Sequence, residues 1–298
     1  MAMSNKVFIY NGEGTNPESV NDLKELFSSD NIFSTHPDIS LCNFKFNPIG
    51  LSTPTFVVPG GSTTVIGRFV KPELSRFREI FEEDYNFVGV CAGAFIATEN
   101  ADLFITHKID NSSTLLPPSY LFSTPALQAN INIIDDYQAV GSFYPNDSYL
   151  HDQPKCNMPY RVSLLTEKKQ TFSQLYLAGP GFFSSRQTNS QSEVVATYIN
   201  RDPYVFNYPS EKKEFKQLSA MIRSKPTDSR RGGRFLSGTH IESCVPYSKL
   251  LNLFKSDSEK TKALKKNDYE ILINERQDTQ NFVESLLADT LKGGRNRK

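Results

Sequence analysis

The sequence contains no tryptophan, and none of its apolar runs is long enough to cross a membrane. The longest runs have the length of a strand, as at Lys6–Tyr10, whereas a membrane-spanning helix needs about 20 apolar residues. The first residues also lack the apolar core of a secretory signal peptide. We therefore expect a protein that does not interact with membranes.

Cysteine is scarce, and Cys42, Cys91, Cys156 and Cys244 form no CxxC motif. This spacing argues against a disulfide scaffold and against a zinc ribbon, whose ligands come in close pairs. No other residues have the spacing of metal ligands, and no glycine-rich loop has the pattern of a nucleotide or cofactor site. We therefore expect no metal, no cofactor and a reducing, cytoplasmic location.

Net charge is also absent, because 33 Lys and Arg residues balance 33 Asp and Glu residues. Such a chain has no excess positive field for a phosphate backbone, so we expect no nucleic-acid partner. The 298 residues are enough for two domains or for one elaborated α/β domain.

Strand and helix patterns alternate in the first third of the chain. Apolar runs at 6–10, 55–58 and 86–90 predict buried strands, and each is followed closely by glycine. Between them, Asn16 and Pro17 predict the start of a helix, and a second helix is expected from Pro72. This alternation predicts right-handed βαβ units and a mostly parallel sheet.

The remainder of the chain gives a less regular pattern. Residues 101–160 are rich in Asn, Ser, Pro and Asp, which indicates long connections with short strands. Further strands are predicted at 41–46, 174–177, 193–198, 219–223 and 234–237, and helices at 246–254 and 258–291. We expect an α/β domain over residues 1–245 and a helical C-terminal extension over 246–298 that packs on it.

The sequence Gly89-Val90-Cys91-Ala92-Gly93 has the G-x-C-x-G pattern of a nucleophile on a sharp turn between a strand and a helix. Small neighbours let the backbone bend there. The helix N-terminus favours the thiolate, and the N–H of Ala92 is free to face an oxyanion. A buried structural cysteine is the more common explanation of a lone Cys, so the surrounding motifs have to decide.

Two further motifs follow predicted strands. Gly60 and Gly61 end the strand 55–58, at the sheet edge where open α/β folds bind ligands, and they offer backbone N–H groups. His240 ends the strand 234–237, and Glu242 lies two positions later, where its carboxylate can orient the imidazole. A strand terminator and a surface histidine are the plainer interpretations. Together with Cys91, a Cys-His-Glu triad is favoured.

This order of motifs resembles the class I glutamine amidotransferase-like superfamily, and most closely the glutaminase-like N-terminal domain of fungal biotin-protein ligases. The segments that carry the resemblance are 7–15, 58–61, 89–94, 179–181, 195–198 and 232–240. The resemblance implies a flavodoxin-like open sheet with helices on both faces. It also implies Cys91 as nucleophile, His240 as base, Glu242 as its orienting acid, and amides near Gly61 and Ala92 as an oxyanion hole.

Two departures from the pattern bear on function. Phe95 occupies the position where glutaminases of this class usually carry a substrate-binding Gln, and no ligase catalytic domain follows the motifs. One hypothesis is a thiol amidohydrolase or amidotransferase-like enzyme that acts on an amide or acyl group of a small molecule or protein. The alternative is a catalytically silent binding or regulatory module without biotin ligase activity, with the C-terminal helices as a possible surface for a protein partner.

Overall fold

The computed structural model describes residues 5–33, 35–43, 53–70, 85–102, 133–140, 160–176, 179–184, 191–199, 204–206, 212–214, 218–226, 232–243, 268 and 270–292. The predicted helices from Pro72 and at 246–254 lie outside these residues, as do Cys156 and Cys244. The following description concerns the described residues.

Five parallel strands form one half of the main sheet. Their spatial order is β2 (Asp38–Cys42), β1 (Lys6–Tyr10), β3 (Thr55–Val58), β4 (Asn86–Val90) and β14 (Arg234–Ser237). The chain moves outward in one direction from β1 and in the other from β3, which is the strand order of flavodoxin-like folds. The predicted α/β fold with a parallel sheet is therefore confirmed.

Antiparallel strands continue the sheet beyond β14. The path runs through β13 (Ser219–Ser224), β10 (Glu193–Tyr198), β7 (Tyr160–Thr166) and β8 (Thr171–Tyr176). Off this path lie β5 (Thr98–Asp102), β6 (Ile134–Val140) and β9 (Gly181–Ser184), and a separate hairpin contains β11 (Tyr204–Phe206) and β12 (Lys212–Glu214). The predicted strand 41–46 begins earlier than expected, because β2 is an edge strand on which polar Asp38 and Ser40 pair with β1.

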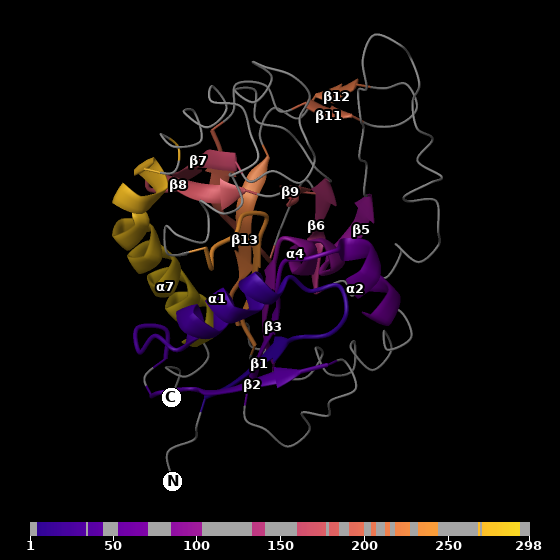
Figure 1. Cartoon of the computed structure of the whole chain (residues 1–298). Coiled ribbons are helices and arrows are strands. Elements are labelled where there is room, and N and C mark those ends of the chain that lie inside the picture. The colour runs from indigo at the N-terminus through magenta and orange to yellow at the C-terminus, as the bar shows by residue number, and fades with distance from the viewer. Residues whose placement is uncertain are drawn as a thin grey trace, which may run out of the picture.

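Helices cover both faces of the sheet (Figure 1). α1 (Pro17–Phe27) begins where the sequence predicts, with the Asn16 side chain capping the N–H of Glu18. α2 (Thr63–Val70) was not predicted, whereas α4 (Ala92–Ile96) follows Cys91 as expected. α7 (Arg276–Lys292) forms the end of the predicted C-terminal helical region.

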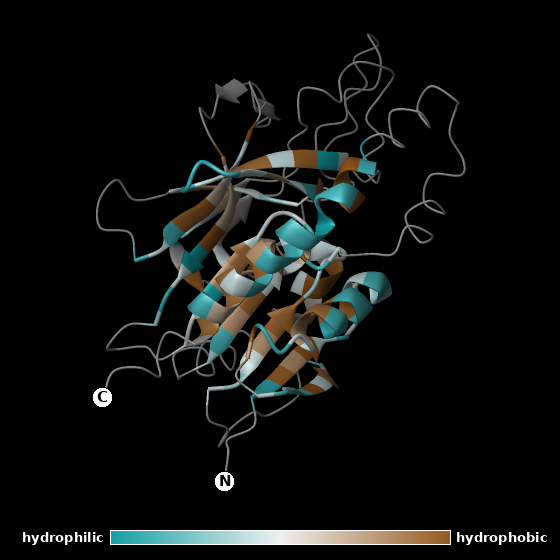
Figure 2. Ribbon diagram, turned by 90° about the vertical axis from the view of Figure 1, so that its left-hand side faces the viewer, coloured by the Kyte–Doolittle hydropathy of each residue, from teal (hydrophilic) through white to brown (hydrophobic). Residues whose placement is uncertain are grey.

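Two apolar cores, one on each face of the sheet, hold these layers together. Alternate residues of a strand point to opposite faces, so Val57 joins the core under α1 and α7 while Phe56 and Val58 join the core under α2 and α4. Figure 2 shows the apolar residues running along the strands behind the helices. The central strands β3 and β4 are therefore buried on both sides, as strands of parallel sheets generally are.

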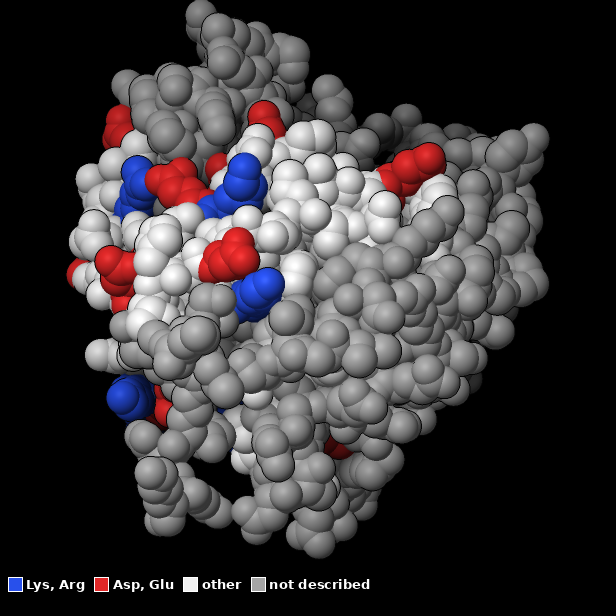
Figure 3. Space-filling view, turned by 90° about the horizontal axis from the view of Figure 1, so that it is seen from below, with Lys and Arg blue, Asp and Glu red and all other residues white. Residues whose placement is uncertain are grey.

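α7 packs into the first core and is also held by charge. Leu287 is fully buried in this core, and Arg223 on β13 forms ion pairs with Glu193 on β10 and Asp289 on α7, at 2.6 and 2.7 Å. Figure 3 shows acidic and basic side chains next to one another on the described part of one face. None of the described helices is both long and apolar enough to cross a membrane.

Leu287→Ala is expected to lower the free energy of unfolding by about 2–5 kcal/mol, because the change leaves a cavity in the core beneath α7. Leu41→Ala, at a side chain that is 47% exposed on β2, is the matched control and should cost less than about 1 kcal/mol. Urea unfolding followed by circular dichroism measures both. Equal effects of the two substitutions would show that α7 does not contribute to the folded core.

Candidate functional site

The predicted site residues meet where three neighbouring parallel strands end. Gly60 follows β3, Cys91 follows β4 and His240 follows β14. Because these strands are parallel, their carboxyl ends lie on one edge of the sheet. This edge also contains the point between β1 and β3 where the chain changes direction, the usual ligand position in such sheets.

Cys91 has a strained backbone, with φ 50° and ψ −106°. A non-glycine residue in such a conformation costs about 1–3 kcal/mol and is found mainly where function requires it. The glycine two positions later is required by packing, because a Cβ on Gly93 would collide with the carbonyl oxygen of Val58 on β3. The G-x-C-x-G pattern therefore lets α4 start directly against the sheet.

His240 and Glu242 form a buried pair. The imidazole Nδ1 lies 2.9 Å from Oε1 of Glu242, and the side chains of these two residues are 7% and 1% exposed. The N–H of His240 donates to the carbonyl oxygen of Leu175 on β8 at 2.9 Å, which fixes the loop that carries the imidazole. The carboxylate thus holds Nδ1 and leaves Nε2 to face another group, as the sequence predicts for an orienting acid.

The electrostatics of His240 favour the imidazolium ion. Burial of the ring opposes its charge, but the neighbouring Glu242 and Cys91 side chains outweigh that effect and raise the pKa of His240 well above its usual value. Nε2 is buried, and within the described part of the chain no aligned hydrogen bond satisfies it. The Cys91 side chain is therefore near enough to act on the charge of the ring.

The Gly60-Gly61 loop has a different arrangement from the one expected. The N–H of Gly60 donates to Oγ of Ser19 on α1 at 3.1 Å, so it is not a free donor for an oxyanion. A Cβ on Gly60 would lie 2.7 Å from Cε1 of His240, and only glycine lets the imidazole approach this loop so closely. Ala92 is the first residue of α4, and its N–H is one of the donors that a helix leaves unused.

Several buried polar side chains at this edge were not identified from the sequence. Ser19 donates to Oε1 of Glu242 at 2.5 Å. The hydroxyl of Thr239, next to His240, donates to Oε1 of Gln174 on β8 at 3.1 Å. Serine in a helix and glutamine in a strand carry no pattern of their own, so only the register of the folded chain could have revealed them.

Two tyrosines hold the 179–181 turn beside the histidine loop. Tyr176 donates to the carbonyl oxygen of Gly179 at 2.8 Å, and Tyr198 donates to that of Pro180 at 3.0 Å. Burial raises the pKa of Tyr198 well above its usual value, with smaller contributions from Tyr176 and Cys91. The Gly-Pro-Gly motif of the sequence is therefore a packing element next to the candidate site.

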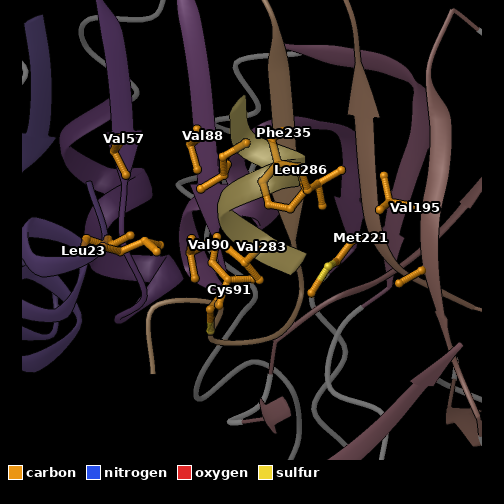
Figure 4. Packing of buried hydrophobic residues seen from close by; sticks show 14 of the residues in the cluster. Leu23, Val57, Val88, Val90, Cys91, Val195, Met221, Phe235, Val283 and Leu286 are labelled. Carbon is orange, nitrogen blue, oxygen red and sulfur yellow. The ribbon is translucent and has the colours of Figure 1, made fainter. Parts of the chain in front are cut away.

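Cys91 is only 5% exposed and lies in the first apolar core. Figure 4 shows it directly after Val90, at the border of the cluster that contains Phe235, Met221 and Val283. Phe95 belongs instead to the second core and is 1% exposed, so its ring fills space beneath α4. No group of His, Cys, Asp and Glu among the described residues could hold a metal ion.

Comparisons with known proteins detect similarity only at the level of three-dimensional structure. No protein-family model matches the chain, and no curated protein matches it. A structure of PurLQS from Thermotoga maritima is 12% identical with a TM-score of 0.46, covering 95% of this chain and 98% of that one.

Two further solved structures are similar to the chain. The CTPS glutaminase domain of Trypanosoma brucei with bound acivicin is 9% identical with a TM-score of 0.39, covering 84% of this chain and 92% of that one. A β-galactosidase from Bacillus circulans has the same identity and TM-score over 80% of this chain and 29% of that one. At these scores the likeness carries no argument about activity, and the fold assignment rests on the strand order.

His240 is expected to make stability depend on pH. Because its pKa is raised in the folded protein, the stabilisation from its protonation is complete below the unfolded value of about 6.5 and is lost as pH rises through the raised pKa. Urea unfolding of the wild type and of His240→Gln at pH values from 6 to about 9 measures how much His240 contributes to the free energy of unfolding. His36→Gln, at an imidazole that is 74% exposed, is the matched control. The expectation is contradicted if the difference in the free energy of unfolding between the wild type and His240→Gln stays constant or grows as the pH rises.

Proposed function

We propose that the protein is a cysteine-dependent amidohydrolase or amidotransferase-like enzyme that acts through Cys91, His240 and Glu242. The observation that carries this proposal is the buried His240–Glu242 pair beside a cysteine in a strained turn. Packing alone requires neither a buried His–Glu pair nor a non-glycine residue with positive φ. Both are costly features that catalytic sites retain.

The first half of the proposed reaction forms a thioester. The Cys91 sulfur, as thiolate, attacks the carbonyl carbon of a primary amide and forms a tetrahedral intermediate that carries a negative oxygen. We expect the N–H of Ala92, at the N-terminus of α4, to donate to that oxygen, with the N–H of Gly61 as the second donor. The C–N bond then breaks as Nε2 of His240 gives its proton to the leaving nitrogen, which departs as ammonia.

The second half hydrolyses the thioester. Nε2, now neutral, takes a proton from water while the water oxygen attacks the thioester carbon, and the C–S bond breaks to release the acid and the thiolate. Glu242 holds Nδ1 and stabilises the imidazolium whenever it forms. No metal or redox partner enters these steps.

The finer assignment within the superfamily is also a proposal. The segments from 7–15 to 232–240 resemble the N-terminal glutaminase-like domain of biotin-protein ligases, and we infer a related module without ligase activity over residues 1–245. Phe95 is packed in the second core, so it does not replace the substrate-binding Gln of glutaminases. The favoured substrate is therefore an amide of a small molecule or protein other than free glutamine.

One observation favours the alternative of a silent binding or regulatory module. The Cys91 side chain belongs to an apolar cluster and is 5% exposed, and Phe95 stands where glutaminases of this class usually carry the substrate-binding Gln. A module of this kind would bind through the sheet edge or through α7 and would not turn over. Chemical reactivity of the thiol separates the two functions.

Iodoacetamide is expected to modify Cys91 at least about tenfold faster than Cys42 at neutral pH. Burial raises the pKa of Cys42 to about 12, so that thiol is a slow internal reference. Peptide mass spectrometry after timed quenching measures each rate. His240→Gln should slow the modification of Cys91 and leave that of Cys42 unchanged. Equal rates at both thiols in the wild type would overturn the enzyme proposal.

Ammonia release from a panel of primary carboxamides, including glutamine, asparagine and their N-acylated and peptide forms, is expected to depend on Cys91. Cys91→Ala should remove the activity entirely, because the sulfur forms the covalent intermediate. Cys42→Ala is the matched control and should retain full activity. No release above background from any amide, or equal release by Cys91→Ala, would favour the silent module.

A further inference from the structure

We propose that Ser19 is a positioning residue that extends the Cys91, His240 and Glu242 set into a chain of four groups. The inference rests on the proposed function and deepens it. Ser19 is the third residue of α1 and is 4% exposed. Its hydroxyl lies between the end of β3 and the carboxylate, so it connects elements that are distant in the sequence.

The direction of each hydrogen bond follows from the chemistry of the partners. The Gly60 N–H can only donate, so Oγ of Ser19 accepts from it at 3.1 Å. A serine hydroxyl has one proton, and this proton points to Oε1 of Glu242 at 2.5 Å. This length is at the short end of the range for a hydroxyl that donates to a carboxylate. Each group of the chain therefore donates to the next, Gly60 to Ser19 and Ser19 to Glu242.

The same carboxylate oxygen accepts from both Ser19 and His240. Nδ1 of His240 lies 2.9 Å from Oε1, whereas Oε2 is buried and has no hydrogen-bond partner among the described residues. The terminal torsion of a Glu side chain has a broad preference and does not fix the carboxylate by itself. Ser19 therefore sets where Oε1 lies, and through it the tautomer and orientation of the imidazole.

Ser19 also holds the loop that approaches the ring. Because its hydroxyl accepts from Gly60, the loop after β3 stays within contact of Cε1 of His240. Because the Gly60 N–H donates to Ser19, the N–H groups of Ala92 and Gly61 are the ones that would donate to the oxyanion. The hydrogen bonds of Ser19 go to Glu242 and Gly60, and it acts through these two residues.

The test is the pH dependence of Cys91 alkylation by iodoacetamide in the full chain. In Ser19→Ala the midpoint of the rate profile should move upward by about one pH unit, and the rate at neutral pH should fall by about tenfold. Ser19→Thr keeps a hydroxyl and should stay within about threefold of the wild type. Ser28→Ala removes a hydroxyl from the end of the same helix, where it donates to Lys24, and should leave the profile unchanged.

The outcomes separate the two proposals. A wild-type profile with its midpoint below that of a free thiol, left unmoved in Ser19→Ala, overturns the role of Ser19 and leaves the proposed function standing. A wild-type profile like that of a free thiol overturns the proposed function and this role with it. If Ser19→Ala does not fold, Ser19→Cys carries the test, since its S–H is a weak donor and should reproduce the shift. Thermal unfolding of every variant provides the check on folding.

Discussion

The buried carboxylate of Glu242 is the constraint around which this edge of the sheet is organised. Moving an ion out of water costs several kcal/mol unless it is paired and hydrogen-bonded. Here the compensation comes from His240 on one side and Ser19 on the other, both at the same oxygen. The strand ends, the start of α1 and the glycine loop must all be in place for this charge to be tolerated.

The positions of His240, Glu242 and Ser19 follow from the packing of helices against both faces of the sheet. Residues that alternate along β3 and β4 divide between two cores, so every strand is locked by helices on both faces. Such a sheet has little freedom to slip, because a shift of one residue would exchange the two faces. The site therefore lies on rigid elements, and the short α4 holds the strained turn of Cys91 against β3.

The parallel half of the fold could be predicted because its local and global patterns agree. Apolar runs followed by glycine predicted the buried strands. Because these strands are parallel, the residues that follow them, Gly60, Cys91 and His240, lie at one edge of the sheet. The antiparallel half was harder. β7 and β8 form a local hairpin, but the pairing of β10 with β7 and with β13 joins segments that lie further apart in the sequence. Gln174 and Ser19 were missed for the same reason: their roles exist only once α1 and β8 are placed.

The positive φ of Cys91 has an evolutionary consequence. Glycine would relieve this strain, and a cysteine codon becomes a glycine codon by one nucleotide change. Substitutions that stabilise a fold are easily reached when nothing opposes them. A lineage that had no use for the sulfur is therefore expected to drift toward glycine at this turn.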